Sequence, residues 1–257
     1  MNQKEYIQDL INHGRWTFTT SEIAERMDKD YYGKIYHLRQ TGRVINPALG
    51  FYVIVPEEYM GTDRLPVERY IHAMMDHLSL GYYVGLLTAA FFYGSSHQSP
   101  QKFQVLVSKK RRNITVNRNQ IIFYQKKMAN NIPTIQRKTS TGYFNISTPE
   151  ATLFDLVEFN RQIGGLEQVG LIAIELSEQL NAKTLVETAQ FYPNPIVQRA
   201  GYLLERIEYE NLASNLEEYI QHLKPASSFL NPSGNRERTN KHPRWKLFIN
   251  QEMEFDL

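Results

Sequence analysis

The sequence predicts an α+β fold, in which an N-terminal winged helix-turn-helix precedes a mixed domain with a small sheet and a helical C-terminal half. Apolar residues recur at helical spacing between 19 and 40, and two strand-like segments follow up to residue 55. Short apolar, β-prone segments dominate residues 103–146, and helical spacing returns from residue 150 onward. The expected domains are 1–60, the winged helix-turn-helix, and 61–257, with helices and a basic sheet in 61–149 and mostly helices in 150–257.

The first helices of the chain have clear start signals. Residues 2–13 are expected to form the first helix, with Tyr6, Ile7, Leu10 and Ile11 directed inward. Thr19 and Glu22 then offer a capping box, in which each side chain bonds to the backbone of the other residue. A short amphipathic helix follows, and its apolar positions are Ile23, Ala24 and Met27.

A second helix and a hairpin complete the N-terminal unit. The helix is expected over 31–40, after a polar turn at 28–30, and Gly42 ends it because glycine tolerates the left-handed conformation. Two strands are expected over 43–45 and 51–55, joined by a turn. Two helices, a tight turn and a hairpin can place the second helix in the major groove of DNA.

The helix over 31–40 has one apolar and one polar face. Tyr31, Ile35 and Leu38 lie on one stripe and are expected in the core. Polar side chains on the other face can hydrogen-bond to base edges, while flanking cations can contact phosphates. The residues expected to contact DNA are Tyr32, Gly33, Lys34, Tyr36, His37, Arg39 and Gln40 from the helix, and Arg43 and Asn46 from the hairpin.

The N-terminal domain carries no excess of positive charge. Residues 1–60 hold seven Lys or Arg and eight Asp or Glu. Because phosphate neutralisation supplies most non-specific DNA affinity, such a domain binds weakly as a monomer. Operator binding would then need a dimer on DNA or help from basic residues elsewhere in the chain. The alternative interpretation is a winged helix that docks on protein and contacts no DNA.

The second domain begins after a linker over 56–66. A helix is expected over 67–79, and a buried helix over 82–93 that Gly94 ends. The expected strands are 103–107, 114–116, 120–124, 132–137 and 142–146. Thr148 and Pro149 are a strong helix start. The expected helices of the C-terminal half are 151–159, 166–180, 184–191, 195–207 and 212–223, followed by a polar loop over 225–242 and a strand over 245–250.

Charge is segregated along the second domain. Between Asp76 and Glu150 there is no acidic residue, and the following segment is rich in acids up to Glu218. A basic patch is expected at the exposed end of the strand over 103–107. Its members are Lys109, Lys110, Arg111 and Arg112. Two interpretations stay open: the patch meets DNA, RNA or an acidic protein, or the basic and acidic segments pack together.

Composition excludes several classes of protein. Without Cys there is no disulfide framework and no thiolate metal site. The first thirty residues carry scattered charges and no long apolar run, so no signal peptide is expected. The longest apolar stretch, 82–93, is too short to span a bilayer. We therefore expect a cytoplasmic protein without membrane contacts.

No catalytic motif is evident, and we expect no enzyme, no cofactor and no metal. The Gly-Ser turn at 94–95 resembles that of a nucleotidyltransferase, but that chemistry needs metal-binding acids shortly downstream, and the next acid is Glu150. The turn is interpreted as a helix stop. His72 and Asp76 lack a third metal ligand and are interpreted as a surface salt bridge. Asp155, one turn before another acid, is expected on a solvated or paired face.

The order of these segments resembles the AbiEi antitoxin family. The resemblance is carried by GKIYHL at 33–38, GFYVI at 50–54, LLTAAFFYG at 86–94, STPEATLFDL at 147–156 and WKLFIN at 245–250. It implies an antitoxin and autoregulator of a type IV toxin–antitoxin pair linked to abortive phage infection. It also implies that the winged helix binds double-stranded DNA at repeats in its own promoter, through residues 32–40. The remaining domain would counteract a nucleotidyltransferase toxin, directly or through a shared nucleic-acid target.

Three functional hypotheses follow. The first is a DNA-binding repressor with an antitoxin domain. The second is an enzyme that acts on nucleic acid and is targeted by a winged helix, and the third is a scaffold whose winged helix binds protein. Salt-dependent binding to duplex DNA separates the third hypothesis from the first two. Dependence of any activity on magnesium would favour the second.

Overall fold

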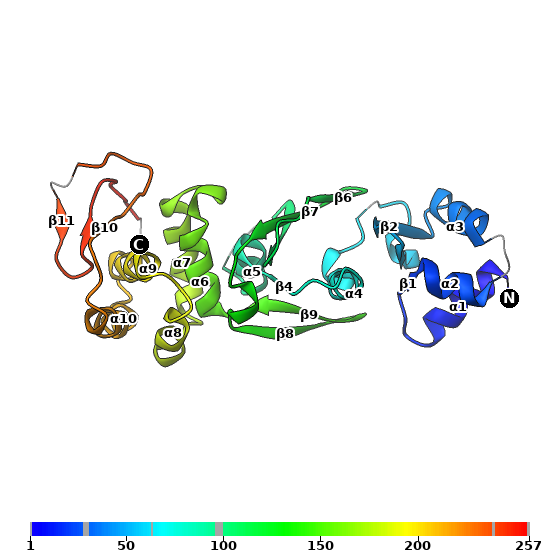
Figure 1. Cartoon of the computed structure of the whole chain (residues 1–257), viewed down its shortest axis with the longest axis horizontal. Helices are drawn as coiled ribbons and strands as arrows, with labels where there is room; N and C mark the ends of the chain where they lie inside the picture. The colour runs from blue at the N-terminus through cyan, green and yellow to red at the C-terminus, as the bar shows by residue number, and fades with distance from the viewer. Residues whose placement is uncertain (1, 28–30, 63, 96–99, 238–239, 256–257) are drawn as a thin grey trace. The chain divides into compact units, whose positions relative to one another are not determined.

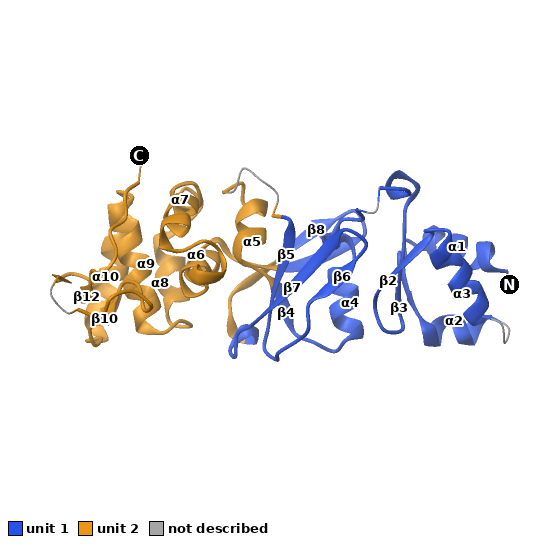
Figure 2. Ribbon diagram, turned by 90° about the horizontal axis from the view of Figure 1, so that it is seen from above, with its two compact units in different colours: residues 1–83, 101–130, 136–145 blue, residues 84–100, 131–135, 146–257 orange. Residues whose placement is uncertain are grey.

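The computed structural model describes residues 2–27, 31–62, 64–95, 100–237 and 240–255. Over these residues it has ten α-helices and three sheets, which makes the fold α+β as predicted. The chain packs as two compact units, which Figure 2 shows in different colours. Unit 1 comprises 1–83, 101–130 and 136–145, and unit 2 comprises 84–100, 131–135 and 146–257. The domain boundary near residue 60 stays a prediction.

Three helices and a small sheet form the N-terminal part of unit 1 (Figure 1). They are α1 (Gln3–Asn12), α2 (Thr20–Arg26), α3 (Tyr31–Gln40), β1 (Thr17–Thr19), β2 (Val44–Ala48) and β3 (Phe51–Ile54). The sheet is antiparallel in the order β1-β3-β2, and β1 was not predicted. The bounds of α3 agree with the prediction, and the arrangement is consistent with a winged helix-turn-helix. The predicted turn at 28–30 lies outside the described residues.

The capping box of α2 forms as predicted. The Thr19 hydroxyl accepts a hydrogen bond from the Glu22 backbone N–H at 3.3 Å, and the Glu22 carboxylate accepts one from the Thr19 N–H at 2.7 Å. Ile23 and Met27 are buried, whereas Ala24, the third apolar position of the predicted amphipathic helix, is exposed. A helix this short has room for a single inward stripe, and Ala24 lies beside it.

The N-terminal core joins all three helices to the hairpin. Its fully or largely buried members are Tyr6, Leu10, Phe18, Ile23, Met27, Ile35, Leu38, Val44 and Ile54. The Tyr6 and Phe18 rings meet edge to face, with centroids 5.6 Å apart. This packing fixes which face of α3 remains in solvent.

A six-stranded sheet has the order β6-β7-β5-β4-β9-β8. Its strands are β4 (Tyr82–Val84), β5 (Lys102–Val107), β6 (Ile114–Val116), β7 (Asn119–Gln125), β8 (Thr134–Thr139) and β9 (Gly142–Ser147). Strand β5 pairs parallel with β7, and β4 pairs parallel with β9. Strands β6 and β7 are both predicted as strands, and they pair antiparallel.

The predicted helix over 82–93 is wrong in its first part. Tyr82, Tyr83 and Val84 form β4, and α5 (Leu86–Phe92) begins only after Gly85. All three residues of β4 are buried, and a short buried strand cannot be told from a buried helix by periodicity. Gly94, with a φ of 77°, ends α5, which confirms the predicted helix stop.

The segment between the hairpin and β4 contains short helices. They are the 3-10 turns η1 (Glu57–Tyr59) and η2 (Val67–Arg69) and the helix α4 (Ile71–His77). The predicted single helix over 67–79 is therefore divided at Tyr70. Ile71, Met74 and Met75 are buried, which agrees with the helical spacing that predicted them.

Five packed helices make up most of unit 2 (Figure 2). They are α6 (Pro149–Glu158), α7 (Leu166–Ser177), α8 (Ala182–Ala189), α9 (Asn194–Arg206) and α10 (Glu210–His222), with the 3-10 turn η4 (Asn160–Gln162) after α6. Another 3-10 turn, η3 (Ala129–Asn131), lies between β7 and β8 in the chain. Thr148 caps α6 and Pro149 occupies its first turn, as predicted. Across the described residues, no helix is both long enough and apolar enough to cross a bilayer.

The C-terminal segment forms a third small sheet in the order β10-β12-β11. Its strands are β10 (Ser228–Phe229), β11 (Lys241–His242) and β12 (Leu247–Phe248). Trp245 lies in the turn before β12, which corrects the predicted strand over 245–250. Its indole is fully buried against Gly201 of α9, where an added Cβ would lie 2.1 Å from the ring.

Candidate nucleic-acid interface

Helix α3 presents a polar face to solvent. Ile35 and Leu38 are buried as predicted, whereas Tyr31 is half-buried against the core. The exposed positions are Tyr32, Gly33, Tyr36, His37, Arg39 and Gln40, with Lys34 half-buried beside them. Tyr32 and Tyr36 are 66% and 63% exposed. Two large aromatic side chains held in solvent on one helix form a surface suited to a partner.

The start of α3 also carries an aromatic pair. The Tyr31 and Tyr32 rings lie 4.2 Å apart, and the neighbouring Tyr32 side chain raises the pKa of Tyr31. A tyrosine hydroxyl, whose ordinary pKa is near 10, is protonated at neutral pH and can donate a hydrogen bond.

The β2–β3 turn depends on Asn46. The side-chain amide of Asn46 donates to the carbonyl oxygens of Ala48 at 2.6 Å and Phe51 at 2.7 Å. Gly50 completes the turn with a φ of 72°, a conformation that favours glycine. Because both amide hydrogens of Asn46 are used inside the hairpin, only its side-chain carbonyl oxygen can meet a base. Spacing alone did not reveal this structural role.

The tip of the hairpin contacts α4. His77 Nε2 lies 3.0 Å from the Leu49 carbonyl oxygen, and the His77 ring lies 5.4 Å from that of Phe51. The side chain of Leu49 is 94% exposed. These contacts fix the backbone of the tip and leave its apolar side chain available.

Arg43 lies at the base of the hairpin and is exposed. Its guanidinium is 3.8 Å from the carboxylate of Glu57, whose side chain is 88% exposed. Such a long, solvated ion pair contributes little to stability. Arg43 can therefore exchange Glu57 for a phosphate at small cost.

The basic patch lies between β5 and β6. Lys109, Lys110 and Arg112 are exposed, and no carboxylate in the described ranges forms an ion pair with any member of the patch. Arg111 differs, because its guanidinium lies 5.5 Å from the Phe123 ring centroid and burial lowers its pKa. The expectation of an exposed run is therefore corrected at Arg111, whose cation covers an aromatic side chain.

Asp155 is fully buried in α6, so it does not lie on a solvated face. The Tyr192 hydroxyl lies 2.9 Å from a carboxylate oxygen of Asp155 and 3.0 Å from the Ala151 carbonyl oxygen. Asp155 thus joins α6 to the segment after α8. In the part of the chain that the structure describes, no three His, Cys, Asp or Glu side chains gather to hold a metal ion.

The predicted His72–Asp76 pair forms on α4. Its nitrogen–oxygen distance is 3.4 Å, which confirms the salt-bridge interpretation. His72 Nδ1 also lies 3.3 Å from the Tyr82 hydroxyl, and its ring lies 4.2 Å from that of Tyr143. The imidazole is therefore part of an aromatic cluster.

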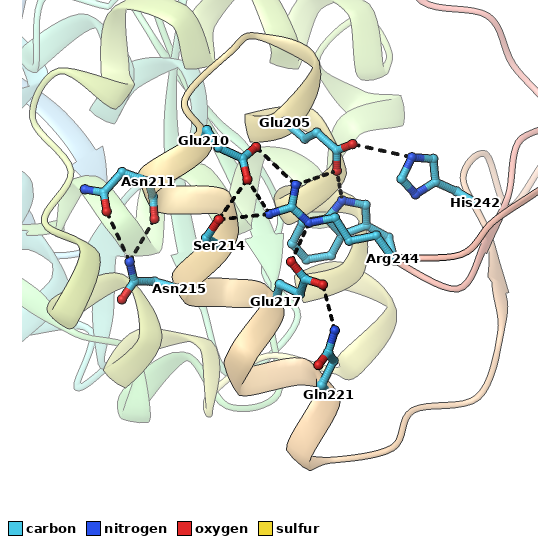
Figure 3. Close-up of polar contacts among 10 residues, drawn as sticks. Glu205, Glu210, Asn211, Ser214, Asn215, Glu217, Gln221, His242 and Arg244 are labelled. Atoms are coloured by element: carbon cyan, nitrogen blue, oxygen red, sulfur yellow. Dashed lines mark hydrogen bonds and ion pairs between the residues drawn. The ribbon is translucent and has the colours of Figure 1, made fainter.

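A polar cluster in unit 2 uses several acids of the acidic segment (Figure 3). Arg244 lies 2.8 Å from Glu210, 2.7 Å from Glu217 and 3.3 Å from Glu205, and His242 lies 3.5 Å from Glu205. The hydrogen bond from Arg244 lowers the pKa of Glu210. The cluster ties the turn before β12 to α9 and α10. Sequence reasoning missed it because its members are far apart in the chain.

Comparison with known proteins gives a family and a fold. Residues 83–206 match the AbiEi antitoxin C-terminal domain. The fold is similar to the crystal structure of the RV2827C protein from Mycobacterium tuberculosis, with a TM-score of 0.67 and 14% identity over 94% of this chain and 89% of that chain. At this identity the likeness shows the fold alone. No curated protein matches the chain. Residues 83–206 therefore belong to the AbiEi antitoxin C-terminal domain family, which confirms the predicted resemblance.

Proposed function

We propose that this chain is the antitoxin and the DNA-binding autorepressor of a type IV toxin–antitoxin operon. The observation that carries the DNA-binding part is the face of α3, where Tyr32, Tyr36 and His37 are exposed while Ile35 and Leu38 anchor the helix. The match of residues 83–206 to an antitoxin family supports the antitoxin part. An antitoxin in turn implies a cognate toxin.

Recognition of the promoter is assigned to α3. Tyr36, His37 and Gln40 carry hydrogen-bonding groups that can reach base edges in the major groove. Gly33 has no side chain where the helix would approach the bases. Lys34, Arg39 and Arg43 are assigned to phosphates, which position the protein without reading sequence.

Affinity for DNA requires more charge than residues 1–60 supply. The exposed cations Lys109, Lys110 and Arg112 belong to the same compact unit as α3 and have no carboxylate partner among the described residues. We assign them to phosphates beside the operator or to nucleic acid shared with the toxin. A dimer on repeated promoter sites would double these contacts.

A mobility-shift titration with the DNA upstream of the gene tests the repressor role. Y36A/H37A should lose sequence preference, with about 1–3 kcal/mol lost per base contact. The matched control is H13A, which removes an exposed histidine from the same N-terminal part. Unchanged operator affinity in Y36A/H37A would contradict the assignment of α3 to the major groove. Binding that does not depend on salt would favour a protein-docking scaffold.

Co-expression with the neighbouring gene tests the antitoxin role. Growth should be restored when a nucleotidyltransferase-like toxin is expressed together with this chain. Y36A/H37A should still restore growth, because neutralisation is assigned to the domain that contains residues 83–206. Rescue lost together with promoter binding would contradict this division of labour. A magnesium-dependent change in nucleic acid caused by the chain itself would favour the enzyme hypothesis instead.

A further inference from the structure

A cavity of about 660 Å³ lies in the N-terminal part of unit 1, between α1, the C-terminal half of α3 and the end of β3. Cavities of roughly 300–1,000 Å³ are the size that holds small organic ligands. Of the residues that line it, His37 and Arg43 are also assigned to promoter binding above, and the others have no role in that assignment.

The floor of this cavity is apolar. Ile7 and Ile11 face it from α1, Trp16 from the following loop, and Leu38 and Ile54 from α3 and β3. Leu38 and Ile54 are almost completely buried, whereas Ile7, Ile11 and Trp16 are half-buried. An aromatic or aliphatic body would remove these exposed apolar surfaces from water, which favours binding.

The rim carries charges of both signs, but its acids already have partners. Glu58 is 3.1 Å from Arg69, and Glu57 is 3.8 Å from Arg43. Lys4 has no carboxylate within ion-pair distance among the described residues. It also lies in the first turn of α1, where the helix dipole disfavours a cation and favours an anion. The unmet charge at the rim is therefore positive.

We propose that this cavity binds an amphipathic organic anion, with the apolar body on Ile7, Ile11 and Trp16 and the anionic group beside Lys4 and Arg43. The carboxylate, sulfonate or phosphate group would replace the loose contact between Arg43 and Glu57. The class of ligand follows from an apolar floor combined with a cation that lacks a partner.

The same cavity touches the proposed DNA-reading helix. His37 of α3 and Thr41, which follows the helix, line its wall, and His37 is also assigned to a base edge. A ligand that engages His37 competes with DNA for this side chain, so ligand and promoter should weaken each other reciprocally. This step, unlike ligand binding itself, rests on the proposed function.

Binding is tested on the full chain with the fluorescent anion anilinonaphthalene sulfonate and with phenylnaphthylamine, the same aromatic body without the sulfonate. Excitation of tryptophan should transfer energy to the bound probe. The chain has two tryptophans, and W16F should remove most of this transfer. The sulfonate should bind several-fold more tightly than the neutral probe.

Matched variants locate the probe. I7D should weaken both probes by about tenfold or more. K4E should weaken only the sulfonate, by about three- to tenfold, whereas K4R should retain its affinity. The control V186D places the same carboxylate in the cavity of about 530 Å³ between α8 and α10, and should leave the probe in place.

Several results would overturn the site. They are equal affinities of the two probes, an unchanged affinity in K4E, or loss of the probe in V186D with retention in I7D. K4E alters an exposed residue, so its result stands even if I7D fails to fold, which circular dichroism would show.

A promoter titration with and without the sulfonate then tests the coupling. The probe should lower promoter affinity of the unmodified chain and have no effect on K4E. If the probe binds and promoter affinity does not change, the competition at His37 is wrong and the site stands. If no promoter fragment binds at all, the proposed function fails and the fluorescence result is unaffected.

Discussion

Two glycines show how the meaning of a residue depends on its surroundings. Gly201 lies inside α9 against Trp245, and a Cβ there would overlap the indole ring at 2.1 Å. G201A should lower the free energy of unfolding by about 1–3 kcal/mol, the usual cost of overpacking, less the gain in helix propensity. Thermal unfolding of G201A and of the unmodified chain measures this loss. A more stable G201A would show that Trp245 can move away.

Replacement of Gly33 is expected to change the free energy of unfolding in the opposite direction. Gly33 is exposed on α3, so G33A should stabilise folding by up to about 1 kcal/mol through helix propensity. The added methyl should nevertheless weaken promoter binding, because Gly33 is proposed to face the bases. Unfolding and mobility-shift titrations on the same preparation separate the effects. Tighter promoter binding in G33A would contradict a close approach of this position to DNA.

Arg244 makes unit 2 sensitive to acid. Its hydrogen bonds lower the pKa of Glu210 below the ordinary value of 4.5. A carboxyl group with a lowered pKa in the folded state stabilises the fold above its unfolded pKa, and this stabilisation is lost as pH falls through the folded value. The melting temperature should therefore fall below about pH 4.5, and less steeply in E210Q. If the melting temperatures of E210Q and of the unmodified chain fall identically with pH, Glu210 does not contribute to the acid sensitivity.

Replacement of Arg244 itself should be costly at neutral pH. R244A leaves Glu205, Glu210 and Glu217 close together without their cation, and should lose about 1–3 kcal/mol of unfolding free energy. The control is R236A, an exposed arginine in the loop before β11. Equal stability of the two variants in denaturant titrations would reduce the cluster to a surface contact.

At the scale of elements, helices with strong caps and regular spacing could be predicted. The bounds of α3 and the cap of α2 follow from local residues, and the exposed face of α3 follows from the positions of Ile35 and Leu38. Strand β4 could not be predicted, because its pairing with β9 is non-local and a buried strand has no alternating pattern. The internal bonds of Asn46 could not be predicted for a different reason: their acceptors, the carbonyl oxygens of Ala48 and Phe51, are nearby backbone groups that residue type and spacing do not identify.

The cap of α6 gives a test at this scale. The Thr148 hydroxyl accepts the Ala151 backbone N–H at 3.2 Å, at the start of the helix on which α7, α8 and α9 pack. T148A should cost about 1 kcal/mol, whereas T148S keeps the hydroxyl and should cost much less. Chemical denaturation distinguishes the two. Equal losses in both variants would assign the effect to the missing methyl group.

At the scale of the whole molecule, charge is separated along the chain although the net charge is only +2. Some acids of unit 2 form ion pairs with Arg244, whereas three cations of the basic patch remain exposed. A nearly neutral protein can therefore still bind a polyanion, because affinity depends on the local arrangement of charge rather than on its sum.

Reversal of these three charges is the decisive test of that arrangement. K109E/K110E/R112E keeps Arg111, whose guanidinium packs on Phe123, so the fold should remain intact within about 0.5 kcal/mol per exposed change. If the patch meets phosphates, promoter affinity should fall. The slope of the logarithm of affinity against the logarithm of salt concentration should become shallower by about 2–3, since each lost contact contributes about 0.9.

The control reverses three exposed cations of unit 2, Lys183, Arg236 and Lys241, and so changes net charge equally. Equal losses in both triple variants would assign the effect to net charge. Unchanged binding and unchanged toxin rescue would leave the patch without a role in either activity.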